Sequence, residues 1–494
     1  MELQTQIDKA ATALNTLSSI IPEAELLLDA ITTVVKHPGQ TGLPAHVKFL
    51  TLQRSQLGAC ITKLQQFAPT NELEPSNGDG TSPEKSLPAV EELIRNTVTN
   101  VHLADQQMAV LKRCSYLTFI SKIGRVSVVD GGHEWIVIRP KTWTLAKVAR
   151  DMAEDGWEWG EYDTMDDVPR DVWADAGPYT LARAIMRLVE DAKAHRVDYR
   201  IPRIRVVMPS LRRSENDDVG LYLDVLEKMD PSVKITISCA DSDFLLSPVP
   251  DMATAVRSLV VHPLTNLTST LNLDQTILMD LVSDITHLRL EPENWLPRNT
   301  QGHIQEENAG EGGIMTKALY PVLQGRKLVC TSEVVGEFMD LVTKIGTETE
   351  RQRARLLLGL DESQCEARAG YNKLTIHPLP ADLQIPIAVI PTSWASASTL
   401  KEVIDSHGLP RIALPVTRAA RSKLSPARIG VFLQGWLMDC HTLTGQKEML
   451  SKFKVWVDQC RLSDEDTGPR VWKIDVTRNL LATRPPHRTK GFSE

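Results

Sequence analysis

Strand-like and helix-like hydrophobic patterns alternate along most of this chain, and this alternation limits the possible folds more than any other feature. A strand buries residues with a period of two, whereas a helix buries them at a spacing of three to four. Between residues 179 and 238 the order is helix, strand, helix, strand, which implies βαβ units and a partly parallel sheet. The predicted elements are a helix over Tyr179–Ala192, a strand over Ile204–Met208, a helix over Leu221–Met229 and a strand over Val233–Ser238.

A second alternating region begins near Ser258 and extends to residue 475. Short strands that alternate with helices over this length predict a compact α/β/α domain with a mostly parallel sheet. The polar, glycine-rich residues 296–314 are predicted to form a long loop. The predicted strands are Leu271–Leu273, Lys327–Cys330, Leu374–His377, Arg411–Val416 and Ile429–Leu433, and the predicted helices are Thr276–Ile285, Glu333–Lys344, Glu348–Leu358 and Ser398–Asp405.

The first 120 residues are predicted to be a helical region, because apolar residues recur there with helical spacing. They are interrupted at 68–88 by a segment rich in Pro, Gly and Ser, which predicts a disordered loop. We expect a helical hairpin or three-helix layer, with a partner-binding coiled coil as the alternative. The chain therefore divides into a helical region (1–120), a middle α/β module (121–250), the α/β/α domain (258–475) and a basic, disordered tail (476–494).

Composition and charge exclude several classes of protein. The 494-residue chain has a net charge of −8, so we do not expect it to coat duplex DNA, although a local basic groove is compatible with this charge. No apolar run approaches the roughly 20 residues needed to cross a bilayer, and the N-terminal residues lack the features of a secretion signal. The seven cysteines are scattered, without the spacing of a zinc or redox motif. We therefore expect a cytoplasmic or nuclear protein that is neither secreted nor bound to a membrane.

Two further features have both a structural and a functional interpretation. The stretch 153–175 combines many acidic residues with three tryptophans. We interpret it as a solvated loop whose tryptophans dock on the parent domain, with binding of basic partners as the alternative. His133 and Trp135 follow Gly131–Gly132, between two strands predicted around the turn at 130–132. A hairpin turn with a packed tryptophan explains them, and an enzymatic site around His133 is the alternative.

The residues that point to chemistry are acidic, since phosphate-loop, dinucleotide-binding, GxSxG and HExxH motifs are absent. Asp274 stands where a predicted strand passes into a helix, and open α/β sheets bind ligands at such strand ends. Glu337, with Glu333 one turn before it, lies on the helix after the next strong strand. Because Mg²⁺ and Mn²⁺ prefer oxygen ligands, these carboxylates can share a metal ion, with a helix-terminal or solvated acid as the alternative.

Several segments resemble the eukaryotic domain-of-unknown-function 1308 family, whose C-terminal half is regarded as a PIN-domain-like nuclease fold. The similarity covers most of residues 90–455. The order of the matching segments along the chain is more informative than any single one of them. These segments are Gly131–Trp135 (GGH-x-W), Leu273–Thr276, Leu323–Phe338, Gly346–Ala354, Thr399–Lys401 and Thr417–Glu448.

The resemblance implies an endoribonuclease that uses Mg²⁺ or Mn²⁺ to hydrolyse single-stranded RNA. Asp274 and Glu337 are then the expected catalytic residues and the first two metal ligands. Arg351 and Arg353, which follow closely, are candidates for binding RNA phosphates. The alternative is that these arginines pair with acidic residues of their own helix.

Two of the four acidic residues that the resemblance leads us to expect are absent from this chain. Where the family's third acid is expected, this chain has Ser398, and where the fourth is expected it has Arg418–Ala419. Glu402 is a possible displaced metal ligand, and Asp405 lies near it. The sequence therefore predicts either a ribonuclease with a degenerate acidic site or a catalytically inactive scaffold that binds RNA or protein, with the N-terminal helices available for protein partners.

Overall fold

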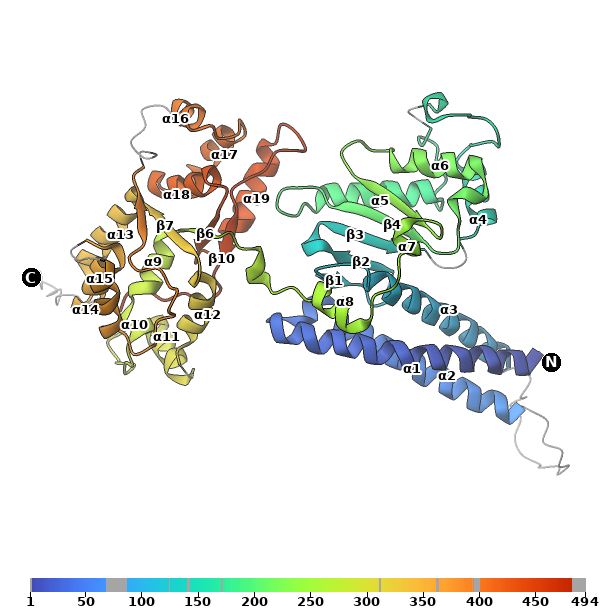
Figure 1. Ribbon diagram of the computed structural model, residues 1–494, viewed down its shortest axis with the longest axis horizontal. Helices are drawn as coiled ribbons and strands as arrows, with labels where there is room; N and C mark the ends of the chain where they lie inside the picture. Colours follow the sequence, from blue (N-terminus) through green and yellow to red (C-terminus); the bar gives the residue numbers. More distant parts are fainter. Residues whose placement is uncertain are drawn as a thin grey trace, which may run out of the picture. The chain divides into compact units, whose positions relative to one another are not determined.

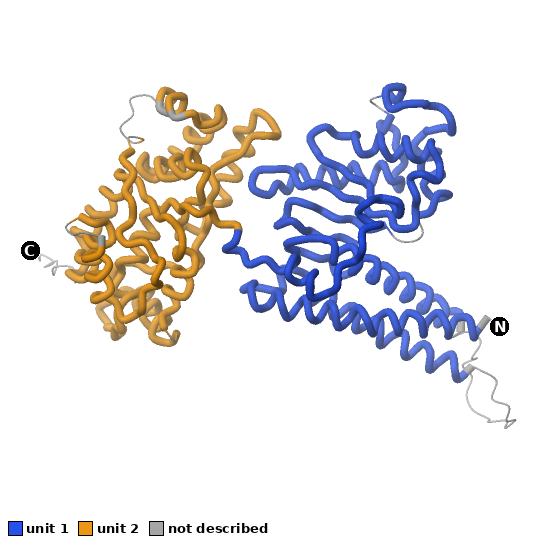
Figure 2. The backbone as a smooth tube through the Cα atoms, viewed as in Figure 1, with its two compact units in different colours: residues 1–265 blue, residues 266–494 orange. Residues whose placement is uncertain are grey.

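The computed structural model describes residues 2–67, 87–123, 125–139, 143–169, 172–310, 312–360, 364–392, 394 and 400–481. The chain divides into two compact units, residues 1–265 and 266–494 (Figure 2). Each unit has its own five-stranded sheet, so the two are described separately. Within the described ranges, no helix is long and apolar enough to cross a membrane.

Unit 1 begins with three long helices, which confirms the predicted N-terminal helical region (Figure 1). They are α1 (Glu2–Val34), α2 (Leu43–Phe67) and α3 (Leu87–Leu111), and the 3-10 helix η1 (Pro38–Thr41) joins the first two. Each helix packs against the other two and buries one apolar side, on which Leu17, Leu57 and Ile94 are completely enclosed. Residues 68–86, which hold most of the predicted disordered loop, lie outside the described residues.

A mixed sheet forms the middle of unit 1, as predicted for an α/β module. Its strands follow the chain order and are β1 (Phe119–Ile120), β2 (Val126–Val129), β3 (Glu134–Ile138), β4 (Arg203–Met208) and β5 (Ile235–Cys239). Neighbours from β1 to β3 are antiparallel, whereas β3, β4 and β5 are parallel. One face packs on α4 (Leu145–Glu154), α5 (Leu181–Ala194) and α6 (Asp217–Glu227), and the other on α8 (Met252–Leu259) and parts of α1 and α3 (Figure 1). A short helix, α7 (Asp243–Leu246), follows β5.

The acidic-aromatic stretch docks on this module through its rings, which confirms the structural interpretation for two of its three tryptophans. Trp157 is 2% exposed and stacks on Trp173, with 6.2 Å between the ring centroids and 24° between the ring planes. Tyr222 of α6 meets Trp157 edge-on at 5.5 Å. The third tryptophan, Trp159, is 52% exposed.

The predicted hairpin at Gly131–Gly132 is also confirmed, because β2 and β3 are antiparallel on either side of this turn. Gly131 and Gly132 have φ angles of 65° and 104°, a region that favours glycine. His133 follows the turn and therefore lies at the amino end of β3, where its Nε2 is 3.4 Å from Asp198.

Unit 2 is built on an all-parallel sheet, which confirms the predicted parallel α/β region. The strands are β6 (Thr270–Leu273), β7 (Lys327–Thr331), β8 (Ala388–Ile390), β9 (His441–Thr444) and β10 (Val471–Lys473), and their order across the sheet is β10-β9-β6-β7-β8. The chain thus starts at the central strand, fills one side and then returns to fill the other. Its helices are α9 (Gln275–Val282), α10 (Asp284–His287), α11 (Arg298–Ala309), α12 (Ile314–Leu323), α13 (Ser332–Ile345), α14 (Glu348–Leu358), α15 (Gln364–Lys373), α16 (Leu400–His407), α17 (Ala413–Ala420), α18 (Pro426–Leu437) and α19 (Met449–Cys460).

Three predicted strands of unit 2 are wrong. Arg411–Val416 and Ile429–Leu433 belong largely to α17 and α18, because their apolar residues are buried in helical packing between other elements. The Ser425 hydroxyl caps α18 and Pro426 occupies its first turn, which are helix-start signals. Leu374–His377 forms an irregular segment, and the edge strand of the sheet is β8 instead.

The predicted long loop at 296–314 is also wrong. It contains α11, whose sequence is mostly polar but whose Ile304 and Glu307 are buried. The Glu307 carboxylate accepts a hydrogen bond from the Arg478 side chain at 2.7 Å. This helix is therefore stabilised by a partner far along the chain rather than by a repeating apolar face.

The predicted disordered tail is wrong for its first residues, 476–481. Arg478 is buried, and its backbone N–H donates to Asp280 Oδ1 at 2.6 Å while its side chain pairs with Glu307. The Leu481 N–H donates to Glu350 Oε1 at 2.7 Å. Buried carboxylates require such partners, so this segment belongs to the core of unit 2. Residues 482–494 lie outside the described residues.

Candidate functional site

The candidate site lies at the carboxyl edge of the sheet in unit 2, where the strand order reverses between β6 and β9. Asp274 follows β6 directly and caps α9, accepting a hydrogen bond from the Gln275 N–H at 2.8 Å. Its Oδ2 also accepts from the hydroxyls of Thr276 at 3.1 Å and Thr444 at 2.8 Å. The Thr276 hydroxyl itself accepts from the Gly445 N–H at 2.8 Å. The two threonines therefore join the ends of β6 and β9 around one carboxyl group.

Asp274 is buried, and burial raises the pKa of its carboxyl group above the ordinary value. The hydrogen bond from Thr444 and the positive charge of Arg428 act in the opposite direction. Arg428 lies in the first turn of α18, and the Gln446 amide is assigned the orientation in which its oxygen accepts from both Arg428 nitrogens, at 2.9 and 3.1 Å. The start of α18 is thus held beside the end of β9.

Glu333 also lies against α18, but on the other side of β6 from Arg428 and β9. It lies in the first turn of α13, and its Oε2 accepts a hydrogen bond from the Thr392 hydroxyl at 3.1 Å. A Cβ atom at Gly430 of α18 would lie 3.0 Å from this Oε2, so the glycine permits the close approach of α18. Glu333, which was only the neighbour of the predicted ligand, is therefore the α13 carboxylate that lies against α18.

The other predicted metal ligands lie in a different environment. Glu337 is exposed on α13, and Glu402 and Asp405 are exposed on α16, while Ser398 lies outside the described residues. Asp274, by contrast, is buried and accepts three hydrogen bonds. Among the described residues, no group of three or more His, Cys, Asp or Glu side chains is placed to hold a metal ion, so the structure does not bring the predicted ligands together there.

The two predicted RNA-binding arginines have internal partners. The Arg353 guanidinium is fully buried and donates to Asp284 Oδ1 and to the Val282 carbonyl, both at 2.7 Å. In this position it is out of reach of an RNA phosphate. The Arg351 side chain is 38% exposed and lies 3.9 Å from Glu348 Oε2, which fits the alternative of pairing within the helix.

Sequence reasoning missed a basic surface around α17 and α18. Residues 406–438 contain five Lys and Arg residues but no Asp or Glu, in a chain whose net charge is −8. Arg418, Arg421 and Lys423 are exposed at the end of α17 and in the turn before α18 (Figure 1). The long interval without Asp or Glu was the feature of the sequence that could have predicted this surface. The two incorrect strand predictions within the interval drew attention away from it.

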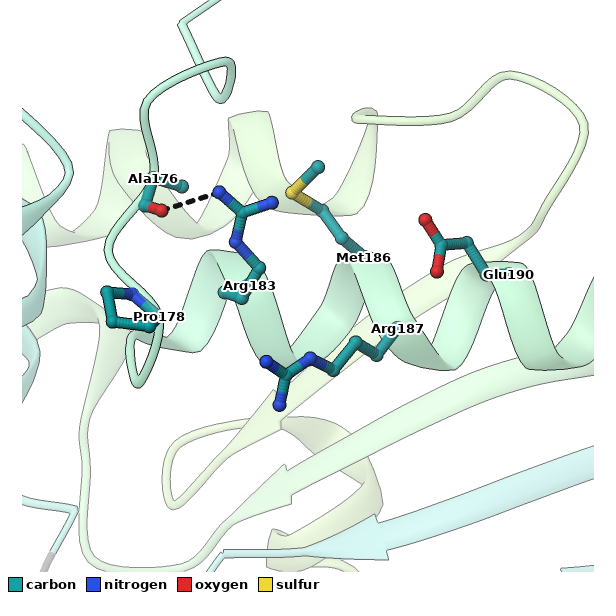
Figure 3. Close-up of a pocket in the computed structure, with 6 residues that line it drawn as sticks. All are labelled: Ala176, Pro178, Arg183, Met186, Arg187 and Glu190. Carbon is teal, nitrogen blue, oxygen red and sulfur yellow. Dashed lines mark hydrogen bonds between the residues drawn. The ribbon is translucent and has the colours of Figure 1, made fainter.

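Unit 1 contains a separate hollow beside α5, of about 390 Å³. Figure 3 shows Arg183 and Met186 on one side of this helix and Arg187 extending away from Glu190. The Arg183 guanidinium donates to the Ala176 carbonyl at 2.6 Å and so fastens the end of the acidic-aromatic stretch to α5 (Figure 3). We interpret the hollow as a gap that remains where the end of the acidic-aromatic stretch docks on α5.

No family model, curated protein or solved structure matches this chain. The resemblance to the domain-of-unknown-function 1308 family therefore depends on the sequence motifs given above.

Asp280, which lies on α9 beyond Asp274, provides a test of the electrostatics of this region. Burial raises the pKa of its carboxyl group well above the ordinary value, and its Oδ2 is buried without a hydrogen-bond partner among the described residues. The folded state therefore holds this proton more tightly than the unfolded state, so stability falls as the pH rises above about 3.9 and through the raised pKa. Asp280→Asn stays neutral, and we expect its unfolding free energy to increase relative to that of the wild type between pH 5 and pH 8.

Urea unfolding at several pH values measures this difference. Asp405→Asn, at an exposed position on α16, is the matched control and should follow the wild-type curve. A constant difference between Asp280→Asn and the wild type over this range would contradict the expected ionisation.

Proposed function

We propose that unit 2 is a PIN-like domain that binds single-stranded RNA at the carboxyl edge of its sheet, and that it binds this RNA without hydrolysing it. The observation that supports this proposal is the exposed basic surface formed by Arg418, Arg421 and Lys423, adjacent to the start of α18. Phosphate contacts from Lys and Arg supply most of the sequence-independent affinity for nucleic acids.

The position of this surface supports an RNA-binding role. The turn that carries Arg421 and Lys423 leads directly into α18, whose Arg428 is close enough to influence Asp274 at the end of β6. The positive charges therefore adjoin the edge at which open parallel sheets usually bind their ligands. The resemblance to the domain-of-unknown-function 1308 family, with its PIN-like half, implies RNA as the polyanion.

The state of the acidic residues favours binding over metal-dependent cleavage. The Asp274 carboxyl group links β6 to β9 through Thr276 and Thr444, and both of its oxygens already accept hydrogen bonds. Glu337, the second expected ligand, is exposed to solvent. We assign these residues a role in shaping the edge and derive no catalytic step from them.

Neutralising the basic surface tests the proposal. We expect the variant Arg418→Gln/Arg421→Gln/Lys423→Gln to bind single-stranded RNA about a hundredfold more weakly at roughly 0.1 M salt, because three lost phosphate contacts each remove about a fivefold contribution. The slope of log K against log salt concentration should become shallower by about 2. Fluorescence anisotropy with a labelled oligonucleotide, over a series of salt concentrations, measures both quantities.

The matched control is Lys48→Gln/Arg54→Gln/Lys63→Gln, which changes the net charge equally at exposed positions of α2. If this control loses RNA affinity instead, the N-terminal helices are the binding surface and the proposal fails. Incubating the wild type and Asp274→Asn with the same RNA and Mn²⁺ tests the second part. If the wild type cleaves the RNA and Asp274→Asn does not, the protein is a ribonuclease and the second part of the proposal fails.

A further inference from the structure

The carboxyl edge of the sheet in unit 1 carries a cluster of positive charge that neither the RNA proposal nor the motif analysis uses. The sequence directed attention to His133, but His133 precedes β3 and so lies at the opposite, amino edge. Ligands of α/β sheets usually bind at the carboxyl ends of the strands. At that end of β3 stands Arg139, whose backbone N–H donates to the Val207 carbonyl of β4 at 2.9 Å.

Two cations converge there on one aromatic ring. The Arg139 guanidinium carbon lies 4.8 Å from the centroid of Trp143, and the Lys147 ammonium lies 5.4 Å from it. Trp143 precedes α4, and Lys147 lies in the first turn of that helix. Arg125 is exposed directly before β2, and its backbone carbonyl accepts a hydrogen bond from the Ile138 N–H at the end of β3, at 2.9 Å. Three positive charges thus gather at the end of β3.

The cluster contains too little negative charge to balance it. Asp151 faces it from α4, but this buried carboxylate is already bonded to Lys147 and to the Leu181 N–H. Arg139 Nε is buried and has no hydrogen-bond partner among the described residues. Burial, and then the repulsion from Arg125, lower the pKa of Arg139. The charged form of this side chain is therefore less stable here than in water. A bound anion would relieve the repulsion between these positive charges.

We propose that Arg125, Arg139 and Lys147 form a binding site for a phosphate group at the carboxyl edge of the sheet in unit 1. A phosphate carries close to two negative charges and several acceptor oxygens, which suit a guanidinium and other cations that converge from separate elements. Free phosphate and the phosphate of a nucleotide share this chemistry. The site is independent of the RNA surface proposed for unit 2.

The test is a calorimetric titration of the full chain with inorganic phosphate, at an ionic strength held constant with chloride. We expect saturable binding that Arg139→Gln weakens at least about tenfold, since a hydrogen-bonded charge is lost. Arg125→Gln, at an exposed position, should weaken it severalfold without disturbing the fold. Arg150→Gln, an exposed position on α4, should bind like the wild type. The glutamine variant of Arg418, Arg421 and Lys423 should also bind like the wild type, which separates this site from the RNA surface.

A parallel titration with adenosine 5′-monophosphate distinguishes the two sources of phosphate. Tighter binding than inorganic phosphate, lost in Arg139→Gln, assigns a nucleotide as the ligand, whereas equal affinity assigns free phosphate. If the wild type binds neither compound at millimolar concentration, the proposal is overturned. Binding that is unchanged in both Arg125→Gln and Arg139→Gln would overturn it as well. Should Arg139→Gln fail to fold, the comparison of Arg125→Gln with Arg150→Gln decides the question.

Discussion

Replacing Arg353 with methionine is expected to reduce the free energy of unfolding of unit 2 by about 3–5 kcal/mol, because it leaves Asp284 as a buried charge without its cation. The loss extends beyond one ion pair. Asp284 also accepts hydrogen bonds from the hydroxyls of Thr347, the N-cap of α14, and Thr349 in the first turn of that helix. Arg353 additionally donates from its Nε to the Leu374 carbonyl at 2.8 Å. Urea unfolding of the full chain, followed by circular dichroism, measures the effect.

Two further variants identify the cause. Arg351→Met removes an arginine two residues away whose side chain is partly exposed, and we expect a change within about 0.5 kcal/mol. The double variant Arg353→Met/Asp284→Asn should recover part of the lost stability, because the unpaired charge is then absent. If Arg353→Met is no more destabilising than Arg351→Met, then the guanidinium is not buried as described, and its assignment to RNA binding would regain support.

Replacing Trp157 with alanine is expected to reduce the free energy of unfolding of unit 1 by a similar amount, about 3–5 kcal/mol. The indole packs against Trp173 and Tyr222, and Tyr162 meets it edge-on at 4.9 Å. Its loss should therefore release the acidic-aromatic stretch from the module. Limited proteolysis of residues 153–175, together with urea unfolding, reports both consequences.

Trp159→Ala is the control, since this tryptophan belongs to the same stretch but is largely exposed. We expect it to change stability by no more than about 0.5 kcal/mol and to leave the proteolysis pattern unaltered. Equal effects of the two substitutions would contradict the docking of Trp157. They would also reopen the alternative in which the whole stretch serves a basic partner.

The alternation of patterns was sufficient to predict the parallel sheet of unit 2 but not all of its strands. The run Ile429–Leu433 is apolar apart from Gly430, and such a run fits a buried strand and a buried helix equally well. The preceding Ser425-Pro426, a helix-start signal, would have decided between them. The helix α11 was harder to predict, because its stabilising ion pair joins Glu307 to Arg478, 171 residues later.

The candidate site was predictable only in part, for a similar reason. Asp274 could be placed at a strand end because the strand, the acid and the helix are consecutive in the sequence. Its partner Thr444 is 170 residues away, and the two meet only because β9 returns to the centre of the sheet. The burial of Arg353 was also hidden, since a helix with alternating charges usually indicates an exposed surface.

The strand order of unit 2 has a consequence for how the chain is made. The central strand β6 has β9 as one of its two neighbours, so the middle of this sheet stays incomplete until the ribosome has released residue 444. The carboxyl groups of Asp280 and Glu307 acquire their hydrogen-bond donors later still, because Arg478 supplies these donors. Both sheet and helices of unit 1 come from residues 1–265, which are translated before unit 2. During synthesis we therefore expect unit 2 to expose an unpaired strand edge until β9 is translated, and such edges favour aggregation.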